Sequence, residues 1–385
     1  MLILRPLLGM SRTTDRRGSR DGSPRVVVVD DSPFMRGLIA DLLTDAGVAV
    51  VGEAGDGAEA LSVVAETAPD VVTMDVEMPG MGGLEAVERL MEETPTPVLM
   101  LSAHTDEGAE VTFEALERGA VDFFSKPGGE VSTGVSRESD RLVEAVKSVA
   151  DADLAAAAWD RDSAASASAT TAGSGGSAAA SASASPSAST TRDGDLDEPL
   201  TVVIGASTGG PNAVERVMSA LPMADCRIVI VQHMPEAFTP RFADRLDAAS
   251  AYDVREATDG ARIGSGEALV ARGGSHTRID SYRAGRLRVK LDEDDSQSVS
   301  PAADVTMRSA AEVVDDPLVG VVLTGMGSDA AEGIRAMADA GARTIAQSED
   351  TCVIYGMPKR AVESGGVDEV HDLDDVADAI VGGEA

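Results

Sequence analysis

The chain contains little lysine and few aromatic residues. Lysine occurs only at positions 126, 147, 290 and 359 of the 385 residues, and aromatic residues make up 3% of the chain. The formal net charge is −34, so the sequence has no concentrated cationic surface of the kind that binds phosphate backbones. These absences argue against a nucleic acid as partner.

Cysteine is limited to Cys226 and Cys352, which both lie close to hydrophobic segments. Two cysteines cannot build a disulfide framework or a cysteine-rich metal site, and their scarcity fits a reducing compartment. Either thiol could serve as a catalytic nucleophile, but a buried cysteine that packs as a small hydrophobic residue is far commoner.

Long hydrophobic runs are absent as well, because no segment is apolar enough over sufficient length to span a bilayer. Arg5 and Pro6 interrupt the opening stretch MLILRPLLGM, so residues 1–23 are predicted to be a disordered leader, or the result of a start codon placed too early, rather than a signal peptide. We expect a cytoplasmic protein. The acidic, lysine-poor composition resembles that of salt-accumulating halophiles; the alternative is an ordinary acidic protein without a salt requirement.

Two regions alternate apolar strand-like runs with amphipathic stretches. Residues 24–150 contain RVVVVDD followed by FMRGLIADLLTDAG, and residues 199–385 repeat this rhythm. The alternation predicts an α/β protein with two doubly wound parallel sheets, the first flavodoxin-like and the second Rossmann-like. Residues 151–198 between them are mainly Ala, Ser, Thr and Gly, which predicts a flexible linker with a reach of about 35 to 40 Å.

Three carboxylates in the first region follow predicted strands. Asp30 and Asp31 come after RVVVV and Asp75 comes after DVVTM, while Ser102 follows PVLML and Lys126 precedes a proline. Acidic groups at neighbouring strand ends repel one another unless a hard cation such as Mg²⁺ lies among them. Each aspartate taken singly would more often cap a helix or start a turn. Together, in this order with a serine and a lysine, they favour a phosphoryl site.

Three residues of the second region suggest a hydrolase. Ser207 follows VVIGA, His233 follows IVIVQ, and Asp329 lies in the GMGSD loop after VVL. The carboxyl ends of parallel strands meet at one edge of a sheet, so a nucleophile, a base and an orienting carboxylate are expected together there. His276 follows a turn-like RGGS; it lines the site or lies in a surface loop. The Met326 N–H is a candidate donor to an oxyanion.

Two other interpretations of these loops stay open. The small-residue loop that begins at Ser207 leads into a predicted helix and would by itself favour a phosphate-cradling loop. Asp329 could simply cap the helix that follows it, AAEGIRAMADAG.

The first region resembles the receiver domain of two-component response regulators in VVDDSPFMR, MDVEMPGMGGLEAV, LSAH and FFSKP. The resemblance implies that Asp75 accepts a phosphoryl group from a histidine kinase. It also implies that Mg²⁺ is held by the carboxylates of Asp30, Asp31 and Asp75 and by the carbonyl of Glu77.

The same resemblance assigns a phosphoryl switch to three further residues. Ser102 and Lys126 would sense and bind the phosphoryl group, and Phe123 lies near the position of the switch aromatic residue. Ser102 stands where many receivers carry threonine, and its hydroxyl can make the same hydrogen bond.

The second region resembles the catalytic domain of the chemotaxis methylesterase family, CheB, in IGASTGGP, VQHMP, SPAADVTMRSAA, VVLTGMGSDAAEG and AQSEDTCVIYGMPKRA. The resemblance implies a serine esterase with Ser207 as nucleophile, His233 as general base and acid, and Asp329 as orienting acid. Thr208 would support the histidine, and the Met326 backbone amide would contribute to the oxyanion hole. ARGGSH departs from the family in having Arg272 where proline is usual, and the linker is unusually long.

The resemblance implies removal of methyl groups from glutamate methyl esters on chemoreceptors, and deamidation of receptor glutamines, without a cofactor for the esterase reaction. A resting receiver would cover the cleft through a modest, polar interface, and phosphorylation would weaken that contact. Partners would be chemoreceptors and a histidine kinase, with no membrane insertion. The rival hypothesis is a phosphorylation-controlled module that binds a nucleotide or a protein and performs no chemistry.

Overall fold

The structure is a computed structural model that describes residues 23–102, 106–126, 135–154, 198–293, 297 and 299–382, with the backbone alone for 106–109 and 135–138. Nearly all of the predicted leader and most of the predicted linker lie outside these ranges, so both stay predictions. No helix in the part that the structure describes is long and apolar enough to cross a membrane.

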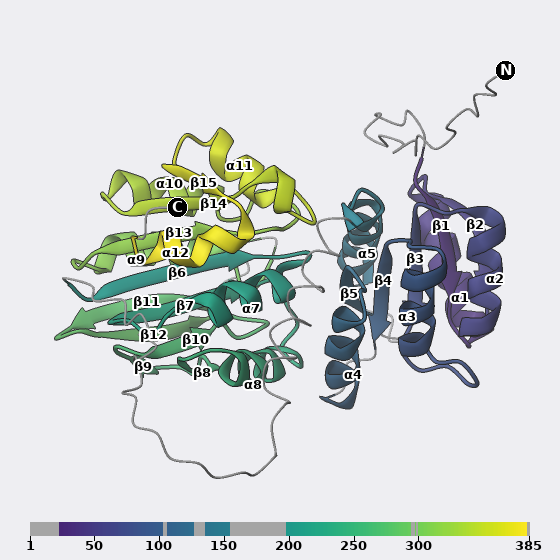
Figure 1. Ribbon diagram of the computed structural model, residues 1–385, viewed down its shortest axis with the longest axis horizontal. Coiled ribbons are helices and arrows are strands. Elements are labelled where there is room, and N and C mark those ends of the chain that lie inside the picture. The colour runs from purple at the N-terminus through teal and green to yellow at the C-terminus, as the bar shows by residue number, and fades with distance from the viewer. Residues whose placement is uncertain are drawn as a thin grey trace, which may run out of the picture.

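The first domain is a parallel five-stranded sheet covered by helices on both faces (Figure 1). The strands run in the order β2-β1-β3-β4-β5, and their bounds are β1 Arg25–Val29, β2 Ala49–Ala54, β3 Val71–Asp75, β4 Val98–Ser102 and β5 Asp122–Ser125. The helices are α1 Pro33–Asp45, α2 Gly57–Thr67, α3 Gly83–Glu93, α4 Asp106–Glu117 and α5 Val135–Ala150.

Successive side chains of β1 point to opposite faces of the sheet, and both faces are covered by helices. Val26 and Val28 pack with α1 and α5, whereas Val27 and Val29 pack with α2, α3 and α4. All four valines are fully buried. A strand buried on both faces is a continuous apolar run, as RVVVV is.

The second domain contains a seven-stranded parallel sheet in the order β15-β14-β13-β6-β7-β10-β8. The strands are β6 Leu200–Ala206, β7 Cys226–Gln232, β8 Asp253–Glu256, β10 Glu267–Val270, β13 Leu318–Val322, β14 Arg343–Gln347 and β15 Glu369–His371. Helices α7 Gly210–Ala220, α8 Thr239–Ala249 and α12 Val376–Ile380 pack on one face, and α9 Ala303–Val313, α10 Ala331–Asp339 and α11 Met357–Glu363 on the other. The predicted α/β class with two parallel sheets is confirmed.

A small antiparallel sheet adds an element that the α/β prediction did not include. It consists of β9 Arg262–Ile263, β11 His276–Arg283 and β12 Arg286–Asp292, in the order β11-β12-β9. Ala284 and Gly285 join β11 to β12 and have φ values of 50° and 75°. Two successive positive φ angles give a tight hairpin turn that matches the twist of the strands. The alternation in RLRVKLD is the sequence signal for this sheet.

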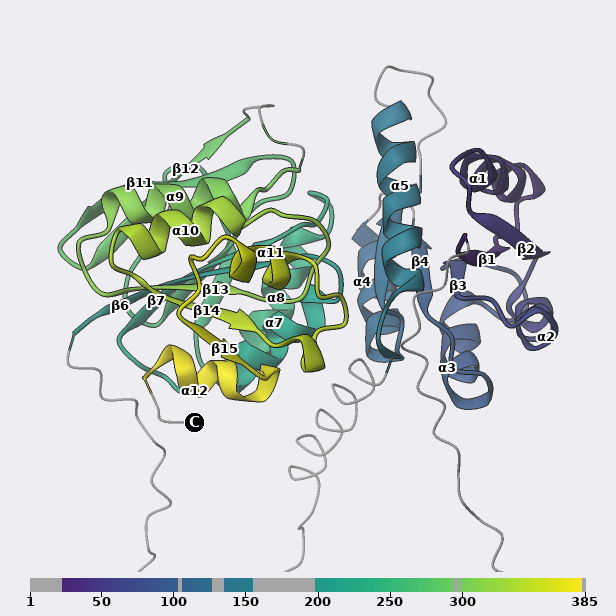
Figure 2. The same cartoon turned by 90° about the horizontal axis from the view of Figure 1, so that it is seen from above.

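The two domains pack against each other through α4 and β5 of the first and α8 of the second (Figures 1 and 2). The rings of Phe113 and Phe123 contact Phe238, and Phe113 also stacks on Phe242. Arg245 borders this cluster and lies over the Phe113 ring, 5.7 Å from its centroid. The expected polar interface is therefore wrong in its centre, which is aromatic, with charged residues at its border.

Candidate active site

The three proposed triad residues follow neighbouring strands in the middle of the larger sheet. Ser207 directly follows β6 and His233 directly follows β7, while Asp329 lies in the loop between β13 and α10. Strand β6 pairs with β7 on one side and β13 on the other. The chain reverses its direction of winding at such a position, which is where open α/β sheets bind ligands.

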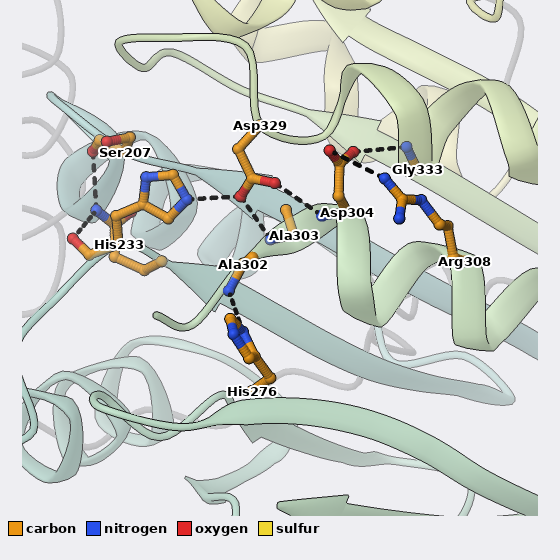
Figure 3. A network of polar contacts seen from close by, with 10 residues as sticks. Ser207, His233, His276, Ala302, Ala303, Asp304, Arg308, Asp329 and Gly333 are labelled. Atoms are coloured by element: carbon orange, nitrogen blue, oxygen red, sulfur yellow. Dashed lines mark hydrogen bonds and ion pairs between the residues drawn. The ribbon is translucent and has the colours of Figure 1, made fainter. Parts of the chain in front are cut away.

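His233 and Asp329 form a direct hydrogen bond, with 2.7 Å between Nε2 and Oδ2 (Figure 3). Burial alone would raise the pKa of Asp329, but its hydrogen bond to His233, the imidazole charge and two backbone amides hold the pKa below its usual range. Asp329 therefore stays ionised beside the imidazole. The structure brings the predicted base and orienting acid together.

Asp329 does not cap the helix that follows it. Its oxygens accept the N–H groups of Ala303, at 2.6 Å, and Asp304, at 2.9 Å, in the first turn of α9. The interpretation of Asp329 as a cap of α10 is thus wrong. The carboxylate is held by the N-terminus of a different helix, where a negative charge is favoured.

The loop after β6 fixes the backbone of Ser207. The Ser207 N–H donates to Thr324 O at 3.1 Å, and Gly210 N–H donates to Ser207 O at 2.7 Å. Gly209 has a φ of 73°, a conformation that favours glycine in the turn into α7. Figure 3 places the second ring nitrogen of His233 on the Ser207 side of the imidazole. Within the described ranges, no hydrogen bond joins Ser207 Oγ to that ring.

Gln232 links the nucleophile loop to the base, a role that the sequence analysis did not assign. Its Nε2 donates to Ser207 O at 2.8 Å and to His233 O at 3.3 Å. A Cβ at Gly210 would lie 2.1 Å from Gln232 Oε1, so only glycine fits there. The polar residue at the end of the otherwise apolar run IVIVQ was the available signal.

The GMGSD loop approaches Ser207 closely because Gly325 has no side chain. A Cβ at Gly325 would lie 2.8 Å from Ser207 Cβ and 2.9 Å from Ser207 N. The Gly325 carbonyl accepts the Met357 N–H at 2.7 Å, which fixes the loop from its other side. Among the described residues, no hydrogen bond uses the Met326 N–H, so this donor is available next to the nucleophile.

His276 is buried at the start of β11, so its interpretation as a surface-loop residue is wrong. Its Nδ1 accepts the Ala302 N–H at 3.1 Å, immediately before the residues that bind Asp329 (Figure 3). The histidine therefore contacts the segment behind the triad. Arg272, which stands where the family usually has proline, pairs with Glu236.

The structure brings the three carboxylates of the predicted acidic site in the first domain close together. Ligand oxygens of Asp30, Asp31 and Asp75 lie within 4.8 Å of one another. Lys126 Nζ lies 2.8 Å from Asp30 Oδ2 and 2.7 Å from Asp75 Oδ2. Three clustered carboxylates fit the oxygen-ligand preference of Mg²⁺. The Glu77 N–H donates to Asp75 Oδ1 at 3.4 Å, which places Glu77 beside this cluster.

The ionisation of this cluster follows from its burial and its lysine. Burial raises the pKa of Asp75, and the Asp30 charge adds to that rise, whereas Lys126 opposes it. Burial alone would lower the pKa of Lys126, but the two carboxylates outweigh it and raise the pKa. Ser102 is buried at the end of β4, the strand next to the one that carries Asp75.

Comparison with known proteins relates each of the two domains to a family model. A model described as CheB methylesterase matches residues 202–380, and one described as response regulator receiver domain matches residues 26–132. A Haloarcula marismortui protein named protein-glutamate methylesterase/protein-glutamine glutaminase is 57% identical over 93% of this chain and 96% of its own. The chain belongs to the CheB methylesterase family.

Two further relatives carry the same name, the second with the number 2 added. The one from Natronomonas pharaonis is 53% identical over 92% of this chain and 96% of its own, and the one from Nitratidesulfovibrio vulgaris is 49% identical over 93% and 98%. The two archaeal relatives come from halophiles, which agrees with the acidic, lysine-poor composition.

A receiver carboxylate reaches the esterase site, a contact that the sequence analysis did not foresee. Asp122, the first residue of β5, lies beside Thr208 and close enough to His233 for their charges to interact. Burial raises the pKa of Asp122 to about 7, and the Phe123 N–H, Thr208 and His233 oppose the rise. The proposed support residue Thr208 thus contacts the receiver.

Neither cysteine has the environment of a catalytic thiol. Both are buried, and burial raises the pKa of Cys226 to about 11 and that of Cys352 further still. A nucleophilic cysteine needs a lowered pKa and access to substrate. The packing role expected for both residues fits these surroundings.

Proposed function

We propose that the chain is a phosphorylation-activated protein-glutamate methylesterase that hydrolyses glutamate methyl esters on chemoreceptors and also deamidates receptor glutamines. The observation that carries the proposal is the 2.7 Å hydrogen bond between His233 and Asp329 beside Ser207. A serine gains nucleophilicity only when a base lies within reach and a third group fixes that base. Names of relatives over nearly the whole chain support the substrate class.

Ser207 performs the first half of the reaction. Its Oγ attacks the ester carbonyl carbon while the free ring nitrogen of His233 takes the hydroxyl proton. The Met326 N–H donates to the oxyanion that forms. Asp329 remains ionised, because its pKa is held low, and stabilises the charged imidazole. The missing Ser207–His233 hydrogen bond forms when substrate is bound, as catalytic contacts often do.

His233 completes the reaction by returning its proton. The tetrahedral intermediate collapses, the ester C–O bond breaks, and methanol leaves with that proton. Water then attacks the acyl enzyme, again with His233 as base, and releases the glutamate carboxyl group and Ser207. With a glutamine side chain, ammonia leaves instead of methanol. None of these steps calls for a cofactor.

The receiver domain, residues 24–150, supplies control of the catalytic domain, residues 199–385. Asp75 accepts the phosphoryl group from a histidine kinase, and Asp30, Asp31, Asp75 and the Glu77 carbonyl would hold Mg²⁺. The metal neutralises phosphoryl charge when it is bound. Ser102 and Lys126 bind the phosphoryl oxygens, and a change at Lys126 reaches β5, which carries Phe123.

Control acts through the interface that the receiver forms over the site. Asp122 lies beside Thr208, the neighbour of the nucleophile, and the phenylalanine cluster holds β5 against Phe238. Phosphorylation that moves β5 releases both contacts and admits a receptor helix. The linker, residues 151–198, keeps the released receiver tethered. The protein acts in the cytoplasm on membrane-bound receptors without inserting into the membrane.

The test is methanol release from methylated receptor membranes in high salt, with and without a small phosphodonor. The wild type is compared with Ser207→Ala, Asp75→Ala and the matched control Ser219→Ala, which changes an α7 serine bonded only to its own helix. Release should require Ser207, and its rise with phosphodonor should require Asp75. A folded wild type that releases no more methanol than Ser207→Ala would favour the binding-module hypothesis.

A further inference from the structure

Helices α9 and α10 begin without capping side chains of their own. The residue before each first turn is alanine, Ala302 for α9 and Ala330 for α10, and neither can accept a hydrogen bond through its side chain. The first amides of a helix need acceptors, particularly where they are buried. Each of these two helices finds its acceptor on the segment that carries the other.

The two caps are reciprocal (Figure 3). Asp329, in the loop that leads into α10, accepts the Ala303 and Asp304 amides of α9. Asp304, in the first turn of α9, accepts the Gly333 N–H of α10 at 2.6 Å. One aspartate of this exchange is the orienting acid of the triad. The other belongs to no step of the reaction described above.

Close packing of α9 against α10 holds the two reciprocal caps in place. A Cβ at Gly333 would lie 2.9 Å from Asp304 Cα and 2.7 Å from Met307 Cβ, so the two helix backbones touch at this point. Asp304 is 7% exposed. A shift of α9 relative to α10 would therefore break the Asp304–Gly333 bond and move the amides that fix Asp329.

The charges around Asp304 come from its own helix and from the elements packed against it. Arg308 of its own helix lies 3.6 Å from its Oδ2, and Arg308 also pairs with Glu332 of α10. Asp329 faces it from the loop before α10, with His233 beyond, and His276 of β11 contacts Ala302. Burial raises the pKa of Asp304 to about 6, the Gly333 bond and Arg308 oppose the rise, and the Asp329 and Glu332 charges add to it.

We propose that Asp304 is a positioning residue of the esterase: by capping α10 from α9 it fixes the orientation of Asp329 and, through it, of His233. The proposal rests on the esterase function proposed above. A carboxylate oxygen of Asp304 holds the geometry by accepting the α10 amide. Its negative charge has a second, smaller effect, because it favours the charged imidazole of the transition state.

Asp304→Asn and Asp304→Ala separate the two effects, because asparagine keeps an oxygen acceptor for Gly333 without the charge. Asp339→Asn and Asp339→Ala, at an exposed pair with Arg335 at the end of α10, are the matched controls. In phosphodonor-activated full-length enzyme, Asp304→Ala should lower kcat by about 10- to 100-fold with little change in KM. Asp304→Asn should keep most of kcat and move the acid limb of kcat/KM to lower pH.

A second readout needs no esterase activity. In a Ser207→Ala background, the low-field NMR signal of the proton between His233 and Asp329 should weaken or shift with Asp304→Ala and stay with Asp304→Asn and both Asp339 variants. This signal separates failure of the inference from failure of the proposed function. A wild type without methanol release would overturn the function alone.

Three results would overturn the inference. One is a folded Asp304→Ala enzyme with unchanged kcat and an unchanged NMR signal. Another is an equal loss of kcat in Asp304→Asn, which would show that the retained acceptor has no positioning role. If Asp304→Ala does not fold, Asp304→Asn decides: an acid limb that coincides with those of wild type and Asp339→Asn would reject the proposal, and a shifted limb would support it.

Discussion

Phe123 of the receiver stacks on Phe238 of the catalytic domain, with ring centroids 4.5 Å apart and planes inclined by 24°. The chain has six phenylalanines, and Phe113, Phe123, Phe238 and Phe242 meet at this interface. A stacked aromatic pair contributes about 1 kcal/mol beyond its buried area. A contact of this size holds the receiver in place and is still weak enough for phosphorylation, whose coupling energies are typically about 1 to 3 kcal/mol, to reverse it.

Removing one ring of this cluster should activate the enzyme without phosphorylation. Phe123→Ala should raise basal methanol release by about 10-fold, because a loss of roughly 1.4 kcal/mol in the interface shifts the open-to-closed ratio by that factor. Phe34→Ala is the matched control, since Phe34 lies on α1 and is 77% exposed, outside this interface. Equal basal activities of the two variants would contradict the proposal that this interface keeps the receiver over the esterase site.

Rising pH should weaken the interface by which the receiver covers the esterase site, because Asp122 loses its proton. Burial in the closed form raises the pKa of Asp122 from 3.8 to about 7, so the closed form binds a proton more tightly than the open form. Asp122 therefore stabilises the closed form fully at a pH below 3.8, and this stabilisation is lost as the pH rises to about 7. The ratio of phosphorylated to basal activity should fall across this window, and dividing the two rates cancels the titration of the triad itself.

Asp122→Asn tests this assignment. Asparagine has the same shape but cannot ionise, so its activity ratio should be independent of pH across the window, whereas Asp41→Asn, on an exposed part of α1, should behave like the wild type. A ratio that falls equally in wild type and Asp122→Asn would rule out Asp122 as the titrating group.

Removal of Mg²⁺ should abolish activation and leave basal hydrolysis intact. In the proposed mechanism, phosphoryl transfer to Asp75 needs a cation among the three clustered carboxylates, whereas the reaction at Ser207 needs none. In methanol-release assays with phosphodonor, EDTA and Asp31→Asn should each reduce the rate to its basal value, while Asp45→Asn on α1 should not. Activation that survives both EDTA and Asp31→Asn would place the cation elsewhere.

Salt should stabilise the protein. The net charge of −34 produces self-repulsion that counterions screen, and the exposed ion pairs that salt weakens, such as Arg118 with Glu114, contribute less than about 1 kcal/mol each. We expect the melting temperature to rise by about 5 to 10 °C from low to multimolar KCl. A melting temperature that is constant or falls would support the ordinary acidic protein instead.

Much of the site was predictable because strand ends in a parallel sheet share one edge. Ser207, His233 and Asp75 each directly follow or end a strand, and a buried strand is easily recognised as an apolar run. His276 was harder to place because it begins a strand of the small antiparallel sheet, whose sequence signal is short. Gln232 and Asp304 gave only weak signals, since a polar residue among apolar ones is informative only when its partner is known.

The sequence by itself predicted the two α/β units, the acidic cluster and the three candidate residues of the triad, because periodicity and motif spacing are local properties of the chain. Only the tertiary structure decided that Asp329 caps α9, that Asp304 caps α10 in return, and that Asp122 of the receiver contacts Thr208. Each of these relationships joins residues that are distant in sequence, and packing alone determines which buried donor meets which acceptor.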